Sequence, residues 1–584
     1  MPLPLAEDAE RWRSVFAERT VLAVAHNVTS ATRLLDLLAL FEGDRRVETV
    51  FTCTGSSALD NGTLELLQAR GALVLAWSEA KQRKFDLAIA TSRGGDLYNL
   101  HAPLIGTPHG AGYNKLLGGS REAFGLTEEW LMHDGRVVPS AIVLSHEEQR
   151  ARLAVSCPDA VPLSLVAGDP CFDELAASAP FRPDYRHALG VRRGQKLVVV
   201  SSTWGRDSVL DAADPERDAL RRALAELPAD EYRVLAAVHP NAYYGHGAWQ
   251  LHTWLAPLLA CGLMLPRPDA QTWKAALVAA DALCGDGGSV TQYGVSLGLP
   301  TVLGSFATDK AAPGSPMALL ARAVPRLSAH RPLLPQLDDA ARRQAADPEL
   351  RHLRSLVTSR PGQAAALLRA LFYQRLGLPE PATPAAARAV PVPAAPGEPA
   401  AGPPEARRSP VVAPMYVTVG TVGTDGDAVT VRRYHAALQR PSQEDHLAGA
   451  QLVADIDDPD TQWPRSADVL LVPARPRGGP VPAERAAAGA EAVARYPGCA
   501  LIATEEPDDG CAALLPGSGT RVRATWSGPR PWWVSPAIAA SVVHERLLSG
   551  PRAPHGPGAG RPPLRVRVTI GADAELALLV VTAL

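Results

Sequence analysis

The stretch ADALCGDGGSVTQYGVSLGLPTVL, residues 280–303, predicts how the middle of the chain folds. A short apolar run ends in the glycine-rich turn 285–289, and apolar residues then recur at helical spacing until a further glycine and a second apolar run. This order predicts a strand, a tight turn, a helix and another strand. The helix that begins near Ser289 would direct unpaired N–H groups and its positive dipole end at the turn, which favours a bound phosphate. An ordinary strand-to-helix turn with a capping serine explains the same glycines, so the turn alone does not define a site.

Segments on both sides of this stretch alternate between strand-like and helix-like patterns. VLAVAHN at 21–27 is followed by the amphipathic ATRLLDLLALF at 31–41, and KLVVVSSTW at 196–204 opens a second series. Strands that alternate with helices form βαβ units around a parallel sheet with both faces covered. The sequence therefore predicts two Rossmann-like units.

Length and composition divide the chain further. Its 584 residues exceed what one core usually holds, and the eleven prolines of residues 379–414 indicate a segment that cannot bury a core. We predict an N-terminal Rossmann-like lobe at 1–180, a second Rossmann-like lobe at 181–378, a Pro/Ala-rich linker at 379–414 and a separate C-terminal α/β domain at 415–584. The strand-like runs of the last domain, such as MYVTVGTV and CALIAT, assign no role to it.

The composition excludes several classes of function. A net charge of −3 gives no basic footprint for nucleic acid. No apolar run reaches the ~18 residues of a membrane-spanning helix, although peripheral membrane contact stays open. The N-terminus lacks the apolar core of a signal peptide, so we expect a cytoplasmic protein. The seven cysteines are scattered without a C-x-x-C pair, and no carboxylate cluster of the metal-binding type is evident, so we predict that no disulfide, metal ion or other cofactor is required.

Three predicted strand ends in the second unit carry polar groups. Ser202 and Thr203 follow KLVVVS, His239 follows YRVLAAV, and the third strand ends in the glycine turn. The carboxyl ends of parallel strands meet at one edge of a sheet, where α/β proteins bind their ligands. Three such ends in succession predict a cleft, whose candidate donor-binding residues are Ser202, Thr203, Asp286, Gly287, Gly288 and Ser289.

Another candidate lies in the glycine-dense loop His101–Gly119 of the first unit. His109 is fixed by Pro108 on one side and left accessible by Gly110 on the other. A pKa near ~6.5 lets an imidazole accept and return a proton at neutral pH. We therefore predict an acid–base role for His109, although an incidental histidine on a surface loop has the same sequence. His26 also ends a predicted strand, where a lone histidine is more often structural.

The order of these motifs resembles that of the CDP-glycerol glycerophosphotransferases of teichoic acid synthesis and, more distantly, other nucleotide-dependent enzymes of the GT-B fold. The segments that carry the resemblance are 109–115, 168–173, 202–204, 239–240 and 285–289. Three of them depart from the family pattern. Cys171 stands where an arginine is usual, Ser202 replaces a proline, and the glycine turn keeps only the aspartate and the last serine. The Asp-Gly-Gly-Ser turn also looks like that of the non-hydrolysing UDP-N-acetylglucosamine 2-epimerases, which share the fold.

The resemblance implies two lobes of the GT-B type and a transferase that moves a glycerophosphoryl or glycosyl group from a CDP- or UDP-linked donor to a hydroxyl acceptor. It implies His109 as the general base and His239, if protonated, as the group that stabilises charge on the leaving nucleotide. Asp286 would orient His239 or the turn, or cap the helix. Two alternatives stay open: an epimerase or hydrolase that acts on a UDP-sugar, and a binding or scaffold protein without turnover. The oligomeric state is not indicated.

Overall fold

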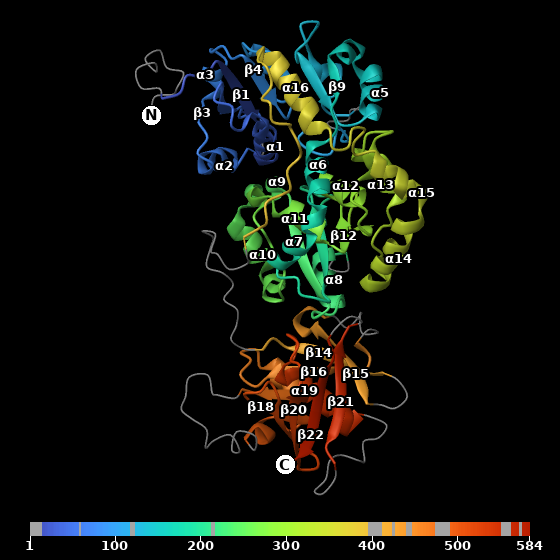
Figure 1. Cartoon of the computed structure of the whole chain (residues 1–584). Coiled ribbons are helices and arrows are strands. Elements are labelled where there is room, and N and C mark those ends of the chain that lie inside the picture. The colour runs from blue at the N-terminus through green and yellow to red at the C-terminus, as the bar shows by residue number, and fades with distance from the viewer. Residues whose placement is uncertain are drawn as a thin grey trace.

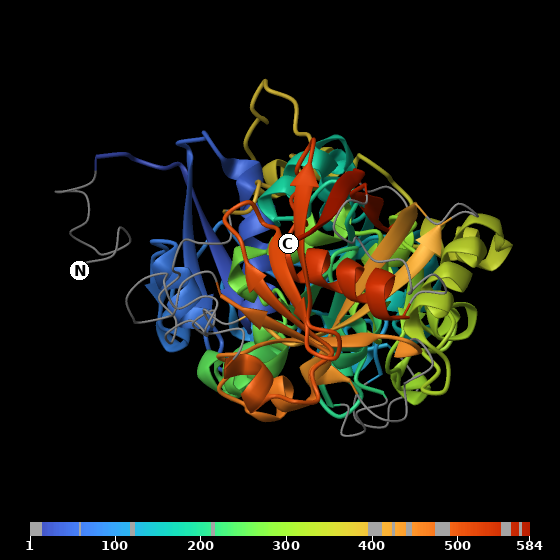
Figure 2. The same cartoon turned by 90° about the horizontal axis from the view of Figure 1, so that it is seen from below.

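The computed structural model describes residues 14–57, 60–116, 123–211, 217–394, 412–422, 427–439, 447–473, 491–549, 562–571 and 575–584. They form two α/β lobes, one above the other in Figure 1, and a barrel below the second lobe. Figure 2 views the molecule from the barrel end.

The first lobe is built on a parallel sheet of seven strands in the order β3-β2-β1-β4-β5-β8-β9. The central strand β1 is an apolar run whose last five residues are buried, because both faces of the sheet are covered. Helix α1 follows directly, and a capping box between Asn27 and Ser30 closes its N-terminus. The elements are β1 Arg19–Ala25, α1 Val28–Leu38, β2 Val47–Cys53, α2 Thr63–Ala69, β3 Val74–Leu75, α3 Trp77–Ala80, β4 Leu87–Ala90, β5 Leu104–Gly106, α4 Glu128–Leu131, β6 Met132–His133, β7 Arg136–Val137, β8 Ala141–Leu144, α5 Glu147–Ser156 and β9 Ser164–Val166.

The second lobe has a parallel sheet of four strands in the order β11-β10-β12-β13. Residues 280–303 form β12, the glycine turn, α12 and β13, which confirms the predicted strand, turn, helix and strand. Both sheets alternate with helices, as predicted for the two α/β lobes. The elements are α6 Pro170–Ala177, α7 Arg182–Ala188, β10 Lys196–Ser202, α8 Ala219–Glu226, β11 Tyr232–Val238, α9 Pro240–His246, α10 Ala248–Ala260, α11 Thr272–Ala279, β12 Ala282–Gly285, α12 Ser289–Ser296, β13 Thr301–Leu303, α13 Pro316–Ala323, α14 Leu333–Ala346 and α15 Pro348–Ser355.

The chain crosses between the lobes twice, and the two crossings contact each other. The first crossing joins β9 to α6, and the second joins α15 to α16, Ala364–Leu376, which packs against the core of the first lobe although it lies in the range predicted for the second. The carboxylate of Asp173 accepts the N–H groups of Gly362 at 2.7 Å and Ala364 at 3.0 Å. Gly168 has a φ of +93°, and a Cβ there would lie 2.9 Å from the carbonyl oxygen of Arg360. The motif 168–173 therefore forms the junction between the lobes.

The predicted linker begins against the first lobe, where the carbonyl oxygen of Pro379 accepts a hydrogen bond from Arg46 at 2.9 Å, and it then reaches the second lobe. Residues 379–394 contain neither helix nor strand, yet Val390 is buried in the second-lobe core, where its N–H donates to Ser178 Oγ at 2.9 Å. Residues 395–411 of the predicted linker lie outside the described residues. Among the helices that the structure describes, none combines the length and apolar character needed to cross a membrane.

The C-terminal domain is a closed barrel of nine strands in the order β14-β15-β21-β22-β20-β19-β18-β17-β16. The α/β layering predicted for 415–584 is wrong. Strands such as β20 and β21 bury alternate residues, which is the pattern of a sheet with only one covered face. The covered face packs on α19, of which Ala537–Val543 are buried. The elements are β14 Met415–Val422, β15 Ala428–His435, β16 Gln451–Asp455, α17 Gln462–Ser466, β17 Val469–Val472, β18 Leu501–Glu505, β19 Cys511–Leu515, β20 Thr520–Ser527, α19 Pro536–His544, β21 Leu564–Ile570 and β22 Ala577–Ala583.

The barrel is attached to the second lobe by ion pairs and by apolar packing. The guanidinium of Arg433 donates to both carboxylate oxygens of Asp230, at 2.7 and 2.6 Å, and Arg432 donates to Glu231 at 3.1 Å. Leu438 is buried within the second-lobe core.

Candidate active site

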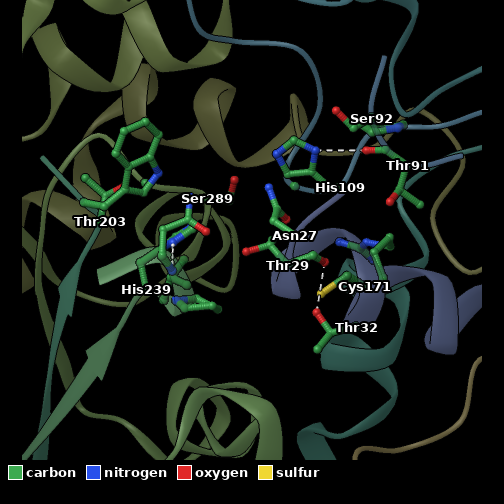
Figure 3. A pocket seen from close by; sticks show the side chains of 18 of the residues that line it. Asn27, Thr29, Thr32, Thr91, Ser92, His109, Cys171, Thr203, His239 and Ser289 are labelled. Atoms are coloured by element: carbon green, nitrogen blue, oxygen red, sulfur yellow. Dashed lines mark hydrogen bonds between the residues drawn. The ribbon is translucent and has the colours of Figure 1, made fainter. Parts of the chain in front are cut away.

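A cleft of about 470 Å³ lies between the two lobes. Residues that follow the carboxyl ends of β1, β4 and β5 line one wall, and residues that follow β10, β11 and β12 line the other (Figure 3). Six of the eight predicted site residues line this cleft: His109, Ser202, Thr203, His239, Gly288 and Ser289. Asp286 and Gly287 are not among the lining residues.

His109 follows β5, and one side of its ring is anchored. Its Nδ1–H donates to the carbonyl oxygen of Thr91 at 2.9 Å, which leaves Nε2 as the unprotonated nitrogen (Figure 3). Burial lowers the pKa of His109, and the positive charges of Arg33 and Lys115 lower it further. The imidazole is therefore neutral at pH 7, and its Nε2 can accept a proton.

The loop that carries His109 is held against the second lobe. The N–H of Ala111 donates to Ser289 Oγ at 3.2 Å. Gly110 has no room for a Cβ, which would overlap the same oxygen. The N-terminus of α12 thus touches the loop of the first-lobe histidine.

His239 is the N-cap of α9, and its ring is also held by one nitrogen. Nδ1 accepts the N–H of Asn241 at 3.0 Å, so Nε2 carries the proton of the neutral ring. Burial lowers the pKa of His239 to about 3, and Lys115 and His109 act in the same direction. His239 is therefore a neutral N–H donor, whereas the role implied by the resemblance requires a protonated ring, and a bound anion would raise its pKa.

Asp286 lies fully buried behind the glycine turn. One of its carboxylate oxygens accepts the N–H groups of Thr203 at 2.7 Å and Val209 at 3.2 Å. Burial raises the pKa of Asp286 to about 6, against the opposing effect of these N–H donors and of Lys115. Asp286 therefore fastens the loop after β10 to the turn after β12, which is the turn-orienting role among the three predicted.

The remaining second-lobe residues also support their own loops. Ser202 Oγ donates to the carbonyl oxygen of Thr203 at 3.2 Å and accepts the N–H of Leu210 at 3.1 Å. A Cβ on Gly287 would lie 3.4 Å from Phe306, so this glycine faces the lobe interior rather than the cleft. Gly288 is the N-cap of α12 and has no side chain to cap the helix, so the first N–H groups of α12 are left for other acceptors.

The cleft is positively charged, which the sequence did not reveal. Its lining residues include five Lys or Arg side chains against one carboxylate, that of Asp36. The five are Arg33, Arg93, Lys115, Arg267 and Lys274. Of these, Lys274 is neutralised by Asp36 and Glu174, each at 2.8 Å. The excess of cations favours an anionic ligand.

Arg33 and Arg93 carry no signal in the sequence that marks them as site residues. Arg33 lies among the leucines of α1, where a polar residue is expected on the solvent face. It is buried instead, because the second lobe covers that face and Tyr293 accepts a hydrogen bond from Arg33 Nη2 at 3.1 Å. Arg93 lies in a loop after β4 with no motif around it.

Cys171, which replaces an arginine of the family pattern, is buried. Burial raises the pKa of its thiol to about 12. In the described residues, no group of three or more His, Cys, Asp or Glu side chains is placed to hold a metal ion. That no cofactor is required stays a prediction.

No protein-family model matches the chain, and no curated protein is similar to it in sequence. Among solved structures, the chain is similar to the wall teichoic acid polymerase TagF, at 12% identity and a TM-score of 0.42 over 62% of this chain and 90% of that one. It is also similar to S. aureus MnaA in complex with UDP (11%, TM-score 0.38, 63% and 99%). A third is a Listeria monocytogenes protein assigned as a UDP-N-acetylglucosamine 2-epimerase (12%, TM-score 0.39, 63% and 99%). The similar solved structures therefore include a wall teichoic acid polymerase and a protein assigned as a UDP-N-acetylglucosamine 2-epimerase. These are the two kinds of protein whose motifs the sequence resembles. At these low identities and TM-scores, the similarity assigns no function to this chain.

Proposed function

We propose that this chain is a transferase that moves a glycerophosphoryl or glycosyl group from a CDP- or UDP-linked donor to a hydroxyl acceptor. One arrangement carries the proposal. The first-lobe wall of a cationic cleft holds a histidine with a free, unprotonated Nε2, and the loop of that histidine contacts an anion-receptive helix start on the other wall.

The second-lobe wall would hold the donor. The diphosphate would accept hydrogen bonds from the first N–H groups of α12 and from the hydroxyl of Ser289, whose oxygen already accepts the N–H of Ala111 and whose hydrogen is free to donate. His239 would add its Nε2–H and, as the anion raises its pKa, a positive charge. Ser202, Thr203 and Asp286 would keep these donors in position.

The first-lobe wall would carry out the proton transfer. The acceptor oxygen forms a bond to the transferred phosphorus or sugar carbon, and its proton passes to Nε2 of His109. The bond between that atom and the bridging oxygen of the nucleotide breaks, and the leaving phosphate keeps the electron pair. The helix start, Ser289 and His239 stabilise the charge on that phosphate.

The experiment is a titration of the full chain with CDP and with UDP by calorimetry, followed by assays of donor consumption with and without a hydroxyl acceptor. Binding of either nucleotide, with acceptor-dependent turnover of the matching donor, is the expected result. Turnover of a UDP-sugar that needs no acceptor would favour the epimerase or hydrolase alternative. A folded chain that binds neither nucleotide would contradict the proposal and leave a binding or scaffold protein.

A further inference from the structure

One face of helix α12 is turned toward the first lobe. Ser289, Gln292 and Tyr293 are spaced i, i+3 and i+4, so they lie on the same side of the helix. Their side-chain oxygens accept hydrogen bonds from the first lobe at 3.2, 2.9 and 3.1 Å, and the donors are, in the same order, Ala111, Asn114 and Arg33. The helix whose first turn would hold the donor is therefore fastened to the first lobe along one side.

Asn114 joins this helix face to the loop of His109. Its amide nitrogen donates one hydrogen bond to Gln292 Oε1 at 2.9 Å and another to the carbonyl oxygen of Ala111. The reverse orientation of the amide would place Oδ1 against that carbonyl oxygen, so the two acceptors fix which way the side chain points. Asn114 is 7% exposed and Gln292 is 2% exposed, and water therefore competes little for their hydrogen bond.

The backbone around Asn114 is also held by the second lobe. The carbonyl oxygen of Asn114 accepts the N–H of Ala312 at 2.8 Å, and Lys115 forms an antiparallel bridge with Ala311. The end of the loop that begins at His109 is thus paired with the second lobe, although the loop belongs to the first.

The ring of His109 and the loop that carries it are fixed from different sides. The hydrogen bond to the carbonyl oxygen of Thr91 sets the rotation of the ring, whereas the bonds at Ala111 and Asn114 set the position of the loop. Because Asn114 bonds to the carbonyl oxygen of Ala111, two residues after His109, a break at Asn114 would be transmitted to the base. A misplacement of about 1 Å can cost on the order of 10²-fold in rate.

We propose that Asn114 and Gln292 are positioning residues, and that their hydrogen bond between the lobes fixes Nε2 of His109 relative to the first turn of α12. They would act through the loop and through the helix. That this placement serves proton transfer rests on the proposed function. The placement itself is a property of the folded chain and can be measured without a substrate.

The test compares wild type with Asn114→Leu, Gln292→Met and the double variant. The matched control is Gln344→Met, which changes a buried glutamine of α14 that does not line the cleft. Nuclear magnetic resonance of the full chain with ring-labelled histidine measures the pKa and the tautomer of His109, whose signal is identified by its loss in His109→Ala. Steady-state assays measure kcat and the KM for the donor.

Each variant should loosen the loop and admit water to His109. Since burial is the main cause that lowers the pKa of His109, this pKa should rise by about one unit. We expect kcat to fall about 10–100-fold, with the KM for the donor within about threefold of wild type. The double variant should match the more affected single variant, because all three lack the same hydrogen bond, and the control should match wild type.

An unchanged pKa and tautomer of His109 in folded Asn114→Leu and Gln292→Met would overturn the proposal, as would additive effects in the double variant. If the variants raise the pKa together but wild type shows no acceptor-dependent turnover, the positioning role stands and the proposed function fails. If Asn114→Leu does not fold, Asn114→Ser avoids steric strain and still lacks the amide donor. It should give the same rise in the pKa of His109, and an unchanged pKa would contradict the role of Asn114.

Discussion

The two walls of the cleft present their polar groups in different ways. On the second-lobe wall, Ser202 and His239 are hydrogen-bonded to the backbone of their own loops, and Asp286 bonds the backbone of Thr203 from behind the wall, so the surface is already formed. On the first-lobe wall, Arg33 and Arg93 keep buried N–H groups without partners. A preformed surface loses little conformational freedom on binding, whereas unpaired buried cations gain most when an anion arrives. Under the proposed function, the second lobe would therefore bind its ligand through groups already held in place, and the first lobe would bind through side-chain charge.

The largest expected effect is on kcat, and it should distinguish the proton-accepting histidine of the first-lobe wall from the donor-binding histidine of the second. His109→Ala should lower kcat by about 10²–10⁴-fold, because the proton acceptor is lost, and leave CDP affinity within about twofold. His239→Ala should lower both kcat and nucleotide affinity. Steady-state assays and calorimetry measure the two quantities, and His187→Ala on the exposed surface of α7 is the control. Equal activity of wild type and His109→Ala would remove the base from the first-lobe wall.

The second effect concerns the free energy that is lost when the carboxylate of Asp286 is buried in its charged form behind the second-lobe wall. Asp286 has a pKa of about 6 in the folded chain against 3.8 as the ordinary value, so the folded state binds its proton more tightly than the unfolded state. The stability of wild type should therefore fall as the pH rises from 4 through 6, whereas Asp286→Asn lacks this titration. The difference in unfolding free energy should shift in favour of the variant by up to about 3 kcal/mol between pH 4 and 7. Denaturation at several pH values measures it, and a difference that does not change with pH would show that the buried carboxylate is not strained.

A smaller effect concerns the contact between the walls. Ser289→Ala removes a donor to the diphosphate and the acceptor of the Ala111 N–H, so CDP affinity should fall about 5–10-fold. Calorimetry measures this fall, and Ser355→Ala on the exposed face of α15 is the matched control. An affinity equal to that of wild type would place the diphosphate away from the start of α12.

The smallest expected effect is on the pH profile. Because the pKa of His109 is lowered, the acid limb of kcat/KM should lie below pH 6.5 in wild type. Lys115→Gln removes one of the nearby positive charges, so the pKa of His109 should rise and the limb should move to higher pH by less than about one unit. A limb that stays in place or moves to lower pH would contradict the coupling between Lys115 and the base.

The part of the site that follows strand ends could be predicted from the sequence. Apolar runs and glycines locate the ends of β10, β11 and β12, and parallel strands must bring those ends to one edge. His239 follows such a strand end in the second sheet and His109 follows β5 in the first, and both line one cleft. Their protonation could not be predicted, because it depends on Lys115 and on burial by both lobes.

Features set by contacts between distant segments escaped prediction. Arg33 resembles a solvent-facing residue of α1 until the second lobe covers it. The motif 168–173 carries part of the family resemblance, and its two aspartates cap α6 and bind the second crossing, which the sequence did not indicate. The barrel of the last domain is closed by pairings between strands far apart in the chain, such as β15 with β21, which strand-like runs alone do not reveal.

The two chain segments that cross between the lobes, from β9 to α6 and from α15 to α16, lie together and bear on how the lobes could move. Since Asp173 on the first crossing accepts the N–H groups of Gly362 and Ala364 on the second, a rotation of one lobe against the other would bend both crossings at the same place. Lys274 and Glu174 belong to the second lobe, and Asp36 belongs to the first. A movement of the lobes that parted Lys274 from Asp36 would leave the ammonium group paired with Glu174, so this shared ion pair would oppose the movement without leaving a buried charge alone.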